Sequence, residues 1–238
     1  MATVLLVERE RHSVLEHLVD AVVAVQRAHP VRVGIDGIDA AGKTTLADEL
    51  AGLVAARGFP VIRATIDGFH RSRSQRYRLG RGSPEGYYHD SFDFPALRQE
   101  LLDPLGPRGD RTYRRAVFDL HSDRPDPGVP EHADPDAVLL FDGVFLMRPE
   151  LEECWELAIF VDCSPEVAIR RGVLRDARNG DAAEIEQRYR TRYLPGQELY
   201  LAECRPRERA DLLVMNDDVT LPVVAGRVGD SRGDRSLN

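Results

Sequence analysis

The chain has 238 residues, of which 42% are hydrophobic, so it is long enough for one compact domain with a sizeable core. Its net charge of −8 argues against broad binding to nucleic acids or membrane surfaces, which relies on basic protein surface. No stretch of the sequence approaches the roughly 20 apolar residues of a membrane-spanning helix.

The N-terminal residues and the cysteines indicate a cellular compartment. The apolar run over residues 4–7 is too short for the core of a signal peptide. The three cysteines are widely spaced and form no CxxC pair, which is typical of thiols in a reducing environment. We therefore expect a cytoplasmic protein.

The first third of the chain predicts a βαβ unit. Ser13 and Glu16 have the spacing of a helix capping box, and apolar residues then recur at helical intervals. The expected elements are a helix ending before Pro30, a strand over 31–36, a helix from about 43 to 57 and a strand over 60–67. A strand, a loop, a helix and a second strand in this order favour a parallel sheet.

The rest of the chain alternates irregular segments with buried strands. Residues 68–93 and 104–135 have no clean period, and their aromatic and charged content favours substrate-binding insertions. The regular elements expected are a helix over 95–102, strands over 137–142, 157–162 and 210–215, and helices beginning near 165 and 181. Residues 226–238 are expected to form a flexible tail, so residues 1–225 are predicted to form a single domain.

The most specific single motif lies between the first predicted strand and the helix that follows it. It fits the pattern GxxxxGK[ST] and consists of Gly37, Ile38, Asp39, Ala40, Ala41, Gly42, Lys43 and Thr44. Glycines let backbone N–H groups turn toward phosphate oxygens, and the helix N-terminus adds its dipole. Lys43 supplies a charge near the β- and γ-phosphates, and the Thr44 hydroxyl is placed to hold Mg²⁺. We therefore expect these residues, with Thr45, to bind ATP together with Mg²⁺.

Two carboxylates end predicted strands at the sheet edge where ligands bind in open α/β folds. Asp142 is followed by Gly143, and a carboxylate there can orient Mg²⁺ through water. Asp67 ends the second strand, and we interpret it as the base that accepts a proton from a substrate hydroxyl. Asp36 ends the first strand directly before the loop and is expected to cap it.

Three arginines share one face of a predicted helix. Arg171, Arg175 and Arg178 are spaced by four and three residues, which places their side chains on the same side. Such a face can close over a triphosphate and stabilise charge as a phosphoryl group moves.

These and further motifs resemble the uridine kinase and phosphoribulokinase group of P-loop kinases, and most closely its uridine kinase-like branch. The similarity runs from about residue 31 to residue 216. Beyond the phosphate loop, its markers are the segments DGFH at 67–70, YYHDSFD at 87–93, FDGVF at 141–145 and RGVLRD at 171–176. In this order they are much more specific than the loop alone. Asp142 stands where many uridine kinases carry Glu, and His70 stands where relatives often have Tyr.

The resemblance implies an α/β P-loop kinase fold, with a five-stranded parallel sheet flanked by helices and a lid over the nucleotide. It also implies a catalytic base at Asp67, a contact of Asp90 with a substrate hydroxyl, and lid arginines. The catalytic candidates are then Asp67, Lys43, Arg171 and Arg175. The substrate-binding candidates are Asp67, His70, Tyr88, Asp90 and His121, and the metal candidates are Thr44 and Asp142.

A basic cluster leaves two interpretations of the acceptor open. The cluster follows His70 and consists of Arg71, Arg73, Arg76, Arg78 and Arg81. Its members either belong to a solvated loop or bind a phosphate or carboxylate of the acceptor.

Our leading hypothesis is ATP-dependent phosphorylation of the 5′-hydroxyl of uridine or cytidine. The alternatives are a kinase for a sugar phosphate or a pantothenate-like acid, and a regulatory NTPase without an acceptor. The expected partners are ATP and a small-molecule hydroxyl acceptor, without nucleic acid or membrane. Homo-oligomerisation is left open.

Overall fold

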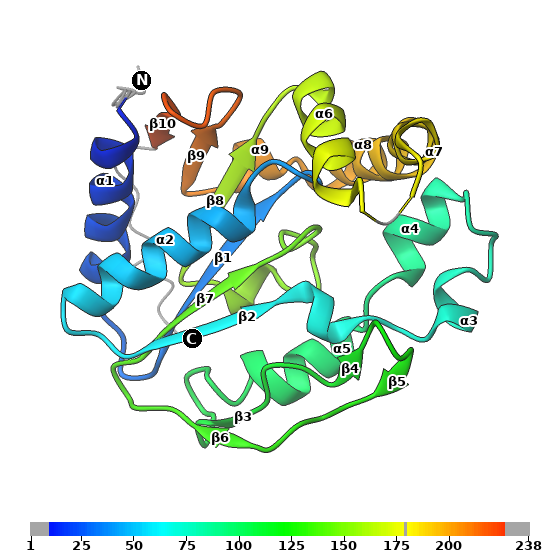
Figure 1. Ribbon diagram of the computed structural model, residues 1–238. Coiled ribbons are helices and arrows are strands. Elements are labelled where there is room, and N and C mark those ends of the chain that lie inside the picture. Colours follow the sequence, from blue (N-terminus) through cyan, green and yellow to red (C-terminus); the bar gives the residue numbers. More distant parts are fainter. Residues whose placement is uncertain (1–9, 179, 227–238) are drawn as a thin grey trace.

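The computed structural model describes residues 10–178 and 180–226, and its centre is a six-stranded sheet (Figure 1). The strands are β1 (Val31–Gly37), β2 (Val61–Thr65), β7 (Val138–Asp142), β8 (Leu157–Asp162), β9 (Leu212–Met215) and β10 (Val223–Gly226). Their order across the sheet is β10-β9-β8-β1-β7-β2. Five neighbouring strands, β9, β8, β1, β7 and β2, run parallel to one another, and β10 is antiparallel to β9.

The five parallel strands confirm the α/β fold class predicted from the sequence. All residues of β1, β7 and β8 are buried, as expected for parallel strands covered on both faces. The sixth strand, β10, is an addition that the sequence pattern does not predict, and it ends at Gly226, the residue at which the tail was expected to begin. The remainder of the predicted tail and the apolar run over 4–7 lie outside the described residues.

Helices flank this sheet. They are α1 (Arg11–Ala24), α2 (Lys43–Ala56), α3 (Arg73–Arg76), α4 (Pro84–Asp90), α5 (Phe94–Leu97), α6 (Pro165–Asp176), α7 (Ala182–Arg188), α8 (Leu194–Cys204) and α9 (Pro206–Arg209). Single 3₁₀ turns occur at Ile66–Phe69 and Glu152–Cys154, and π-helical turns at Arg98–Leu102 and Tyr189–Tyr193. Across residues 10–178 and 180–226, no helix combines the length and apolarity that a membrane crossing requires.

The insertion over 104–135 contains two short antiparallel ladders. One pairs β3 (Thr112–Tyr113) with β6 (Glu131–His132), and the other pairs β4 (Phe118–Asp119) with β5 (Arg124–Pro125). Figure 1 shows these ladders beside α5, on the side of the sheet away from α1 and α2.

Two hydrophobic clusters cover the two faces of the sheet. One includes Val14 of α1 and Leu50 of α2, and the other includes Phe69, Phe141 and Tyr200. Both faces of the sheet are covered by protein, so a ligand can approach only the ends of the strands. In open parallel sheets ligands bind at the carboxyl ends.

Helix α1 begins before the predicted capping box. Its first residue is Arg11, and the preceding Glu10 makes no side-chain cap. Ser13 and Glu16 therefore lie inside the helix, and the capping-box interpretation is wrong. The helix extends because packing of its apolar face, including the buried Val14, outweighs the local signal.

The segment over 68–93 is more helical than its irregular pattern indicates, since it contains α3 and α4. Ser83 starts α4: its Oγ accepts a hydrogen bond from the N–H of Gly86 at 2.9 Å, and Pro84 occupies the first turn. This short helix packs against α8 and brings the hydroxyl of Tyr87 to Asp39 of the phosphate loop.

Candidate active site

A cavity of about 970 Å³ opens at the carboxyl edge of the sheet. Its wall is formed by the phosphate loop, the ends of β2 and β7, one face of α6 and the segment after β9. Small-molecule sites in proteins have volumes of roughly 300–1,000 Å³, so this cavity has room for a large ligand or two smaller ones.

The phosphate loop depends on two glycines. Gly42 has a φ of +100°, and a Cβ there would lie 2.7 Å from Nδ2 of Asn216. A Cβ on Gly37 would lie 2.1 Å from the backbone O of Val161. Both positions exclude a side chain, so the spacing of the motif follows from backbone geometry. Helix α2 begins at Lys43, so its unpaired N–H groups face the loop.

Part of the loop faces the cavity. The residues that line it are Asp39, Ala40, Gly42, Lys43, Thr44 and Thr45. Gly37, Ile38 and Ala41 are buried behind this surface. Nζ of Lys43 donates a hydrogen bond to the backbone O of Ile38 at 2.7 Å, which holds the ammonium group within the turn.

Asp36 fixes the backbone where the loop begins. Its Oδ1 accepts the N–H of Gly37 at 2.7 Å, and its Oδ2 accepts the hydroxyl of Tyr200. Asp36 is fully buried, and burial raises its pKa from 3.8 to about 6 in spite of these hydrogen bonds.

We expect Asp36 to make the stability depend on pH. Between pH 3.8 and about 6 the folded protein keeps a proton that the unfolded chain has lost, so the free energy of unfolding falls as the pH rises through this range. The shift corresponds to about 3 kcal/mol. Urea unfolding of the wild type and Asp36→Asn between about pH 4.5 and 7.5 measures it, and the wild type should gain stability relative to the variant toward the acid end. A stability difference that is constant across this range would contradict the raised pKa.

Thr44 and Asp142 meet at the cavity and fit a magnesium site. Oγ1 of Thr44 donates to Oδ2 of Asp142 at 2.6 Å, and Arg63 holds Oδ1 of the same carboxylate at 2.8 Å. Hydroxyl and carboxylate oxygens are the hard ligands that Mg²⁺ prefers, and in kinase sites phosphates and waters complete its shell. Within the described ranges no group of three or more His, Cys, Asp or Glu side chains could hold a metal.

Asp67 lines the same cavity from the 3₁₀ turn after β2. Its Oδ1 lies 3.4 Å from Nε2 of His70, and this contact lowers the pKa of Asp67 below its ordinary value. The His70 ring is itself fixed, because Nδ1 lies 3.1 Å from the backbone O of Ser91 and the ring stacks on Phe92. Asp67 is therefore an ionised, oriented carboxylate at neutral pH.

Arg171 and Arg175 line the cavity from α6. Nη2 of Arg171 donates to the backbone O of Asp217 at 2.9 Å, whereas its Nη1 is buried without a hydrogen-bond partner. Nε of Arg175 pairs with Asp176 at 2.8 Å. Arg178 follows the end of α6 and does not line the cavity, so the predicted face is reduced to two arginines.

Tyr88, which the resemblance implies as a substrate contact, lies in the core and not on the cavity wall. Its side chain is 1% exposed and packs in the core against Phe145 and Tyr200. Successive helical residues point about 100° apart, so on α4 it is the preceding Tyr87 that faces the cavity.

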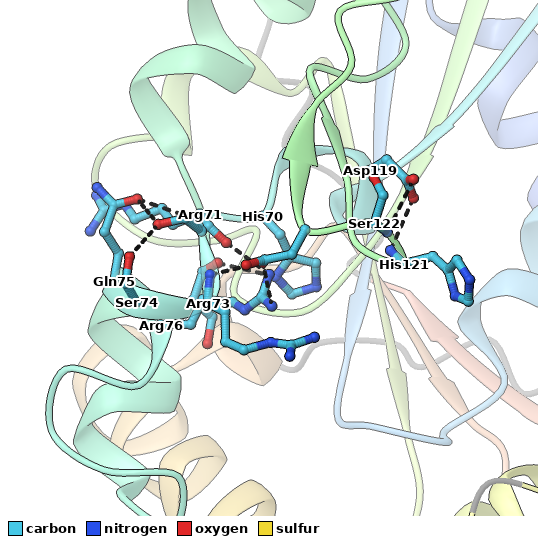
Figure 2. Close-up of polar contacts among 12 residues, drawn as sticks. His70, Arg71, Arg73, Ser74, Gln75, Arg76, Asp119, His121 and Ser122 are labelled. Carbon is cyan, nitrogen blue, oxygen red and sulfur yellow. Dashed lines mark hydrogen bonds and ion pairs between the residues drawn. The ribbon is translucent and has the colours of Figure 1, made fainter.

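Asp90 and His121 also lie away from the cavity. Asp90 is buried, and its Oδ2 is 3.3 Å from Nη2 of Arg78. His121 is exposed in the turn between β4 and β5, which Asp119 shapes by accepting the N–H of His121 at 2.9 Å. Figure 2 shows the His121 ring pointing away from His70. Neither residue belongs to the cavity wall, and their contacts with the substrate stay predictions.

The basic cluster lies beside the cavity. None of its five arginines belongs to the cavity wall that the described residues form. Arg76 is buried, pairs with Asp123 at 3.2 Å and donates to the backbone O of Arg71 at 2.8 Å (Figure 2). Arg73 and Arg81 are exposed. The buried member of the cluster thus joins α3 to the turn between β4 and β5.

Sequence reasoning missed several residues of the cavity wall, among them Arg11, Tyr193 and Asn216. Asn216 directly follows β9, so the rule that singled out Asp142 at the end of its strand could have found it. Tyr193 lies in a π-helical turn, which has no simple period, and Arg11 comes from α1, where it donates to the backbone O of Val219 at 2.7 Å.

Comparisons with known proteins show relatives that are kinases. No family model matches the sequence. The chain is 29% identical over 158 residues to uridine-cytidine kinase B of Dictyostelium discoideum, a match that covers 66% of this chain and 63% of that kinase. It is 25% identical over 198 residues to uridine-cytidine kinase 2-B of Danio rerio, covering 78% and 72%. A solved structure of a possible uridine kinase from Bacillus stearothermophilus has a TM-score of 0.68 at 23% identity, covering 85% of this chain and 97% of that one.

The parallel sheet, the phosphate loop that opens α2 and the oxygen pair beside it define this chain as a P-loop kinase. In sequence the chain is similar to uridine-cytidine kinases over 66–78% of its length, and it shares its fold with the possible uridine kinase of known structure.

Proposed function

We propose that the protein transfers the γ-phosphoryl group of ATP to the 5′-hydroxyl of a nucleoside, either uridine or cytidine. The observation that carries this proposal is the chemistry of the cavity wall away from the phosphate loop. It presents the rings of Tyr87, Phe92 and Tyr193 and the carboxylate of Asp67, and no arginine of the basic cluster. Aromatic faces suit a base, and a carboxylate suits a hydroxyl. The arginines that do line the cavity, Arg11, Arg171 and Arg175, come from α1 and α6 and not from the basic cluster beside the aromatic rings.

The donor binds at the phosphate loop in this proposal. The N–H groups of the loop and of the first turn of α2 surround the phosphate oxygens, and Lys43 adds a positive charge. Thr44 and Asp142 would hold Mg²⁺, which neutralises charge on the phosphates when it is bound. Arg171 and Arg175 lie across the cavity on α6, where they stabilise the negative charge that moves with the phosphoryl group.

Asp67 carries the acceptor chemistry. Its carboxylate accepts the proton of the 5′-hydroxyl as the new oxygen–phosphorus bond forms and ADP leaves. The lowered pKa of Asp67 keeps this group ionised at neutral pH, and His70 holds its orientation. In phosphoryl transfer, positioning of this kind supplies most of the rate enhancement.

An acceptor screen by coupled ADP release tests the proposal directly. The panel contains uridine, cytidine, adenosine, ribose 5-phosphate, ribulose 5-phosphate, pantothenate and glycerate, with ATP and Mg²⁺. ADP release that depends on uridine or cytidine is the expected result. Turnover confined to an acid or a sugar phosphate would overturn the nucleoside assignment, and ADP release that no acceptor changes would indicate an NTPase.

The exposed arginines give a second test of the acceptor's charge. We expect Arg73→Ala combined with Arg81→Ala to change kcat/KM for uridine by less than about fivefold, because exposed charges contribute about 0–1 kcal/mol. Arg76 is left intact because its ion pair with Asp123 is part of the fold. The measurement is kcat/KM for each accepted substrate in the wild type and the double variant. A loss above about a hundredfold confined to an anionic acceptor would contradict the proposed function.

A further inference from the structure

Asp39 is an unexpected residue in a phosphate loop. Such a loop collects N–H donors around anionic phosphates, and a carboxylate adds an opposing charge close to them. Asp39 nevertheless lines the cavity, directly before Ala40, whose φ is +59°. A carboxylate in this place is compatible with ATP only if other groups hold it away from the phosphates.

Two side chains hold it. Oδ2 of Asp39 accepts hydrogen bonds from the hydroxyl of Tyr87 at 2.5 Å and from Nε2 of Gln197 at 2.6 Å. Burial raises the pKa of Tyr87, so its hydroxyl stays protonated and remains a donor. Tyr87 belongs to α4 and Gln197 to α8, and these contacts turn the carboxylate toward the aromatic wall of the cavity.

Close packing of α4 and α8 fixes both donors. A Cβ on Gly196 would lie 2.8 Å from Cδ1 of Tyr87 and 2.9 Å from the backbone O of Pro84, so only glycine allows the two helices to approach this far. Gly196 directly precedes Gln197. The positions of the two donors are therefore set by the backbone and not by flexible side chains alone.

Two acceptor atoms in this arrangement, Oδ1 of Asp39 and Oε1 of Gln197, receive no hydrogen bond from the described residues. A carboxylate offers about four lone-pair positions, and Oδ2 uses two of them. No described residue donates a hydrogen bond to Oδ1 of Asp39, and Asp39 is one of the residues that line the cavity. Beside it, Oε1 of Gln197 is buried and has no hydrogen-bond partner. The missing donor at Oδ1 is one that a bound molecule can supply.

We propose that Asp39 binds a second hydroxyl of the acceptor, one that is not phosphorylated, and so selects acceptors with several hydroxyls. The inference rests on the proposed function, because it places the acceptor in this cavity with Asp67 at the reacting hydroxyl. A phosphate or carboxylate would be repelled by Asp39, whereas a neutral sugar ring presents further hydroxyls at suitable distances from the reacting one. Asp39 is thus a specificity-determining residue supplied by the phosphate loop itself.

The test compares kcat/KM for uridine, 2′-deoxyuridine and 3′-deoxyuridine in the wild type, Asp39→Asn and Asp39→Ala. The wild type should lose about 10- to 150-fold on the analogue that lacks the bound hydroxyl, the range for a hydrogen bond to a charged group. In Asp39→Ala this discrimination should fall below about threefold, while KM for ATP changes by less than about threefold. Asp136→Asn, which removes an exposed carboxylate outside the cavity, is the matched control and should discriminate as the wild type does.

Two results would overturn the inference. One is equal discrimination in the wild type and both variants, and the other is a raised KM for ATP with unchanged discrimination, which would assign Asp39 to the donor. Thermal unfolding checks the fold, and Asp39→Asn, which keeps the side-chain volume, decides the matter if the alanine variant does not fold. If the wild type phosphorylates no nucleoside, the proposed function fails, and the same comparison with deoxy forms of the true acceptor still tests Asp39.

Discussion

Lys43→Ala should reduce phosphoryl transfer by about a thousandfold or more with every acceptor, while the protein stays folded. The ammonium group lies inside the phosphate loop, and its loss removes a positive charge from the place where charge builds up in the transition state. The measurement is kcat/KM by coupled ADP release, with circular dichroism and thermal unfolding to verify the fold. The effect on kcat should exceed the effect on ATP affinity, because charge on the transferring group is greatest in the transition state.

Arg73→Ala is the matched control for this variant. It removes a cation that is exposed and outside the cavity wall, so its activity should match that of the wild type. A folded Lys43→Ala protein with activity within about tenfold of the wild type, a change of only about 1.4 kcal/mol, would show that the loop does not bind the transferred phosphate.

Asp67→Asn should lower kcat by about 10²–10⁴ and leave ATP binding nearly unchanged. Asparagine keeps the shape of the side chain and its place beside His70, but it cannot accept the proton of the acceptor hydroxyl. Steady-state kinetics with the acceptor identified by the screen give kcat, and fluorescence titration with an ATP analogue gives the affinity.

The partition between kcat and KM decides the role of Asp67. An unchanged kcat with a raised KM for the acceptor would make it a binding residue and would remove the proton-transfer role. Asp136→Asn again serves as the control, since it removes a carboxylate of the same size from an exposed position. A similar loss of activity in the control would point to a general effect of charge instead of a local one.

The sequence was sufficient for the five parallel strands and for the conformation of the phosphate loop, because both follow from short segments. A parallel strand buried on both faces is a continuous apolar run, and the phosphate loop is set by glycines that a Cβ would exclude. The meeting of Thr44 and Asp142 then follows from the rule that ligand-binding residues gather at the carboxyl ends of parallel strands. These features depend on local pattern plus one general rule of topology.

The acceptor side could not be predicted in the same way. Helix α4 has seven residues within a segment of no clear period, so nothing in the sequence decided between Tyr87 and Tyr88. His121 sits in a turn whose direction is set by the backbone contacts of Asp119. The position of Asp39 depends on Gln197, which lies 158 residues further along the chain. Contacts of this kind require the tertiary structure.

The strand order has a consequence for how the protein is made. β1 and β2 are both synthesised early, yet each pairs with β7, which lies between them in the sheet. A nascent chain therefore carries two apolar strands without a partner until residues 138–142 have left the ribosome. Val161, against which Gly37 packs, emerges later still. The phosphate loop, although encoded near the start, is completed only after residue 161 has emerged, and before β7 appears the growing chain is most exposed to aggregation.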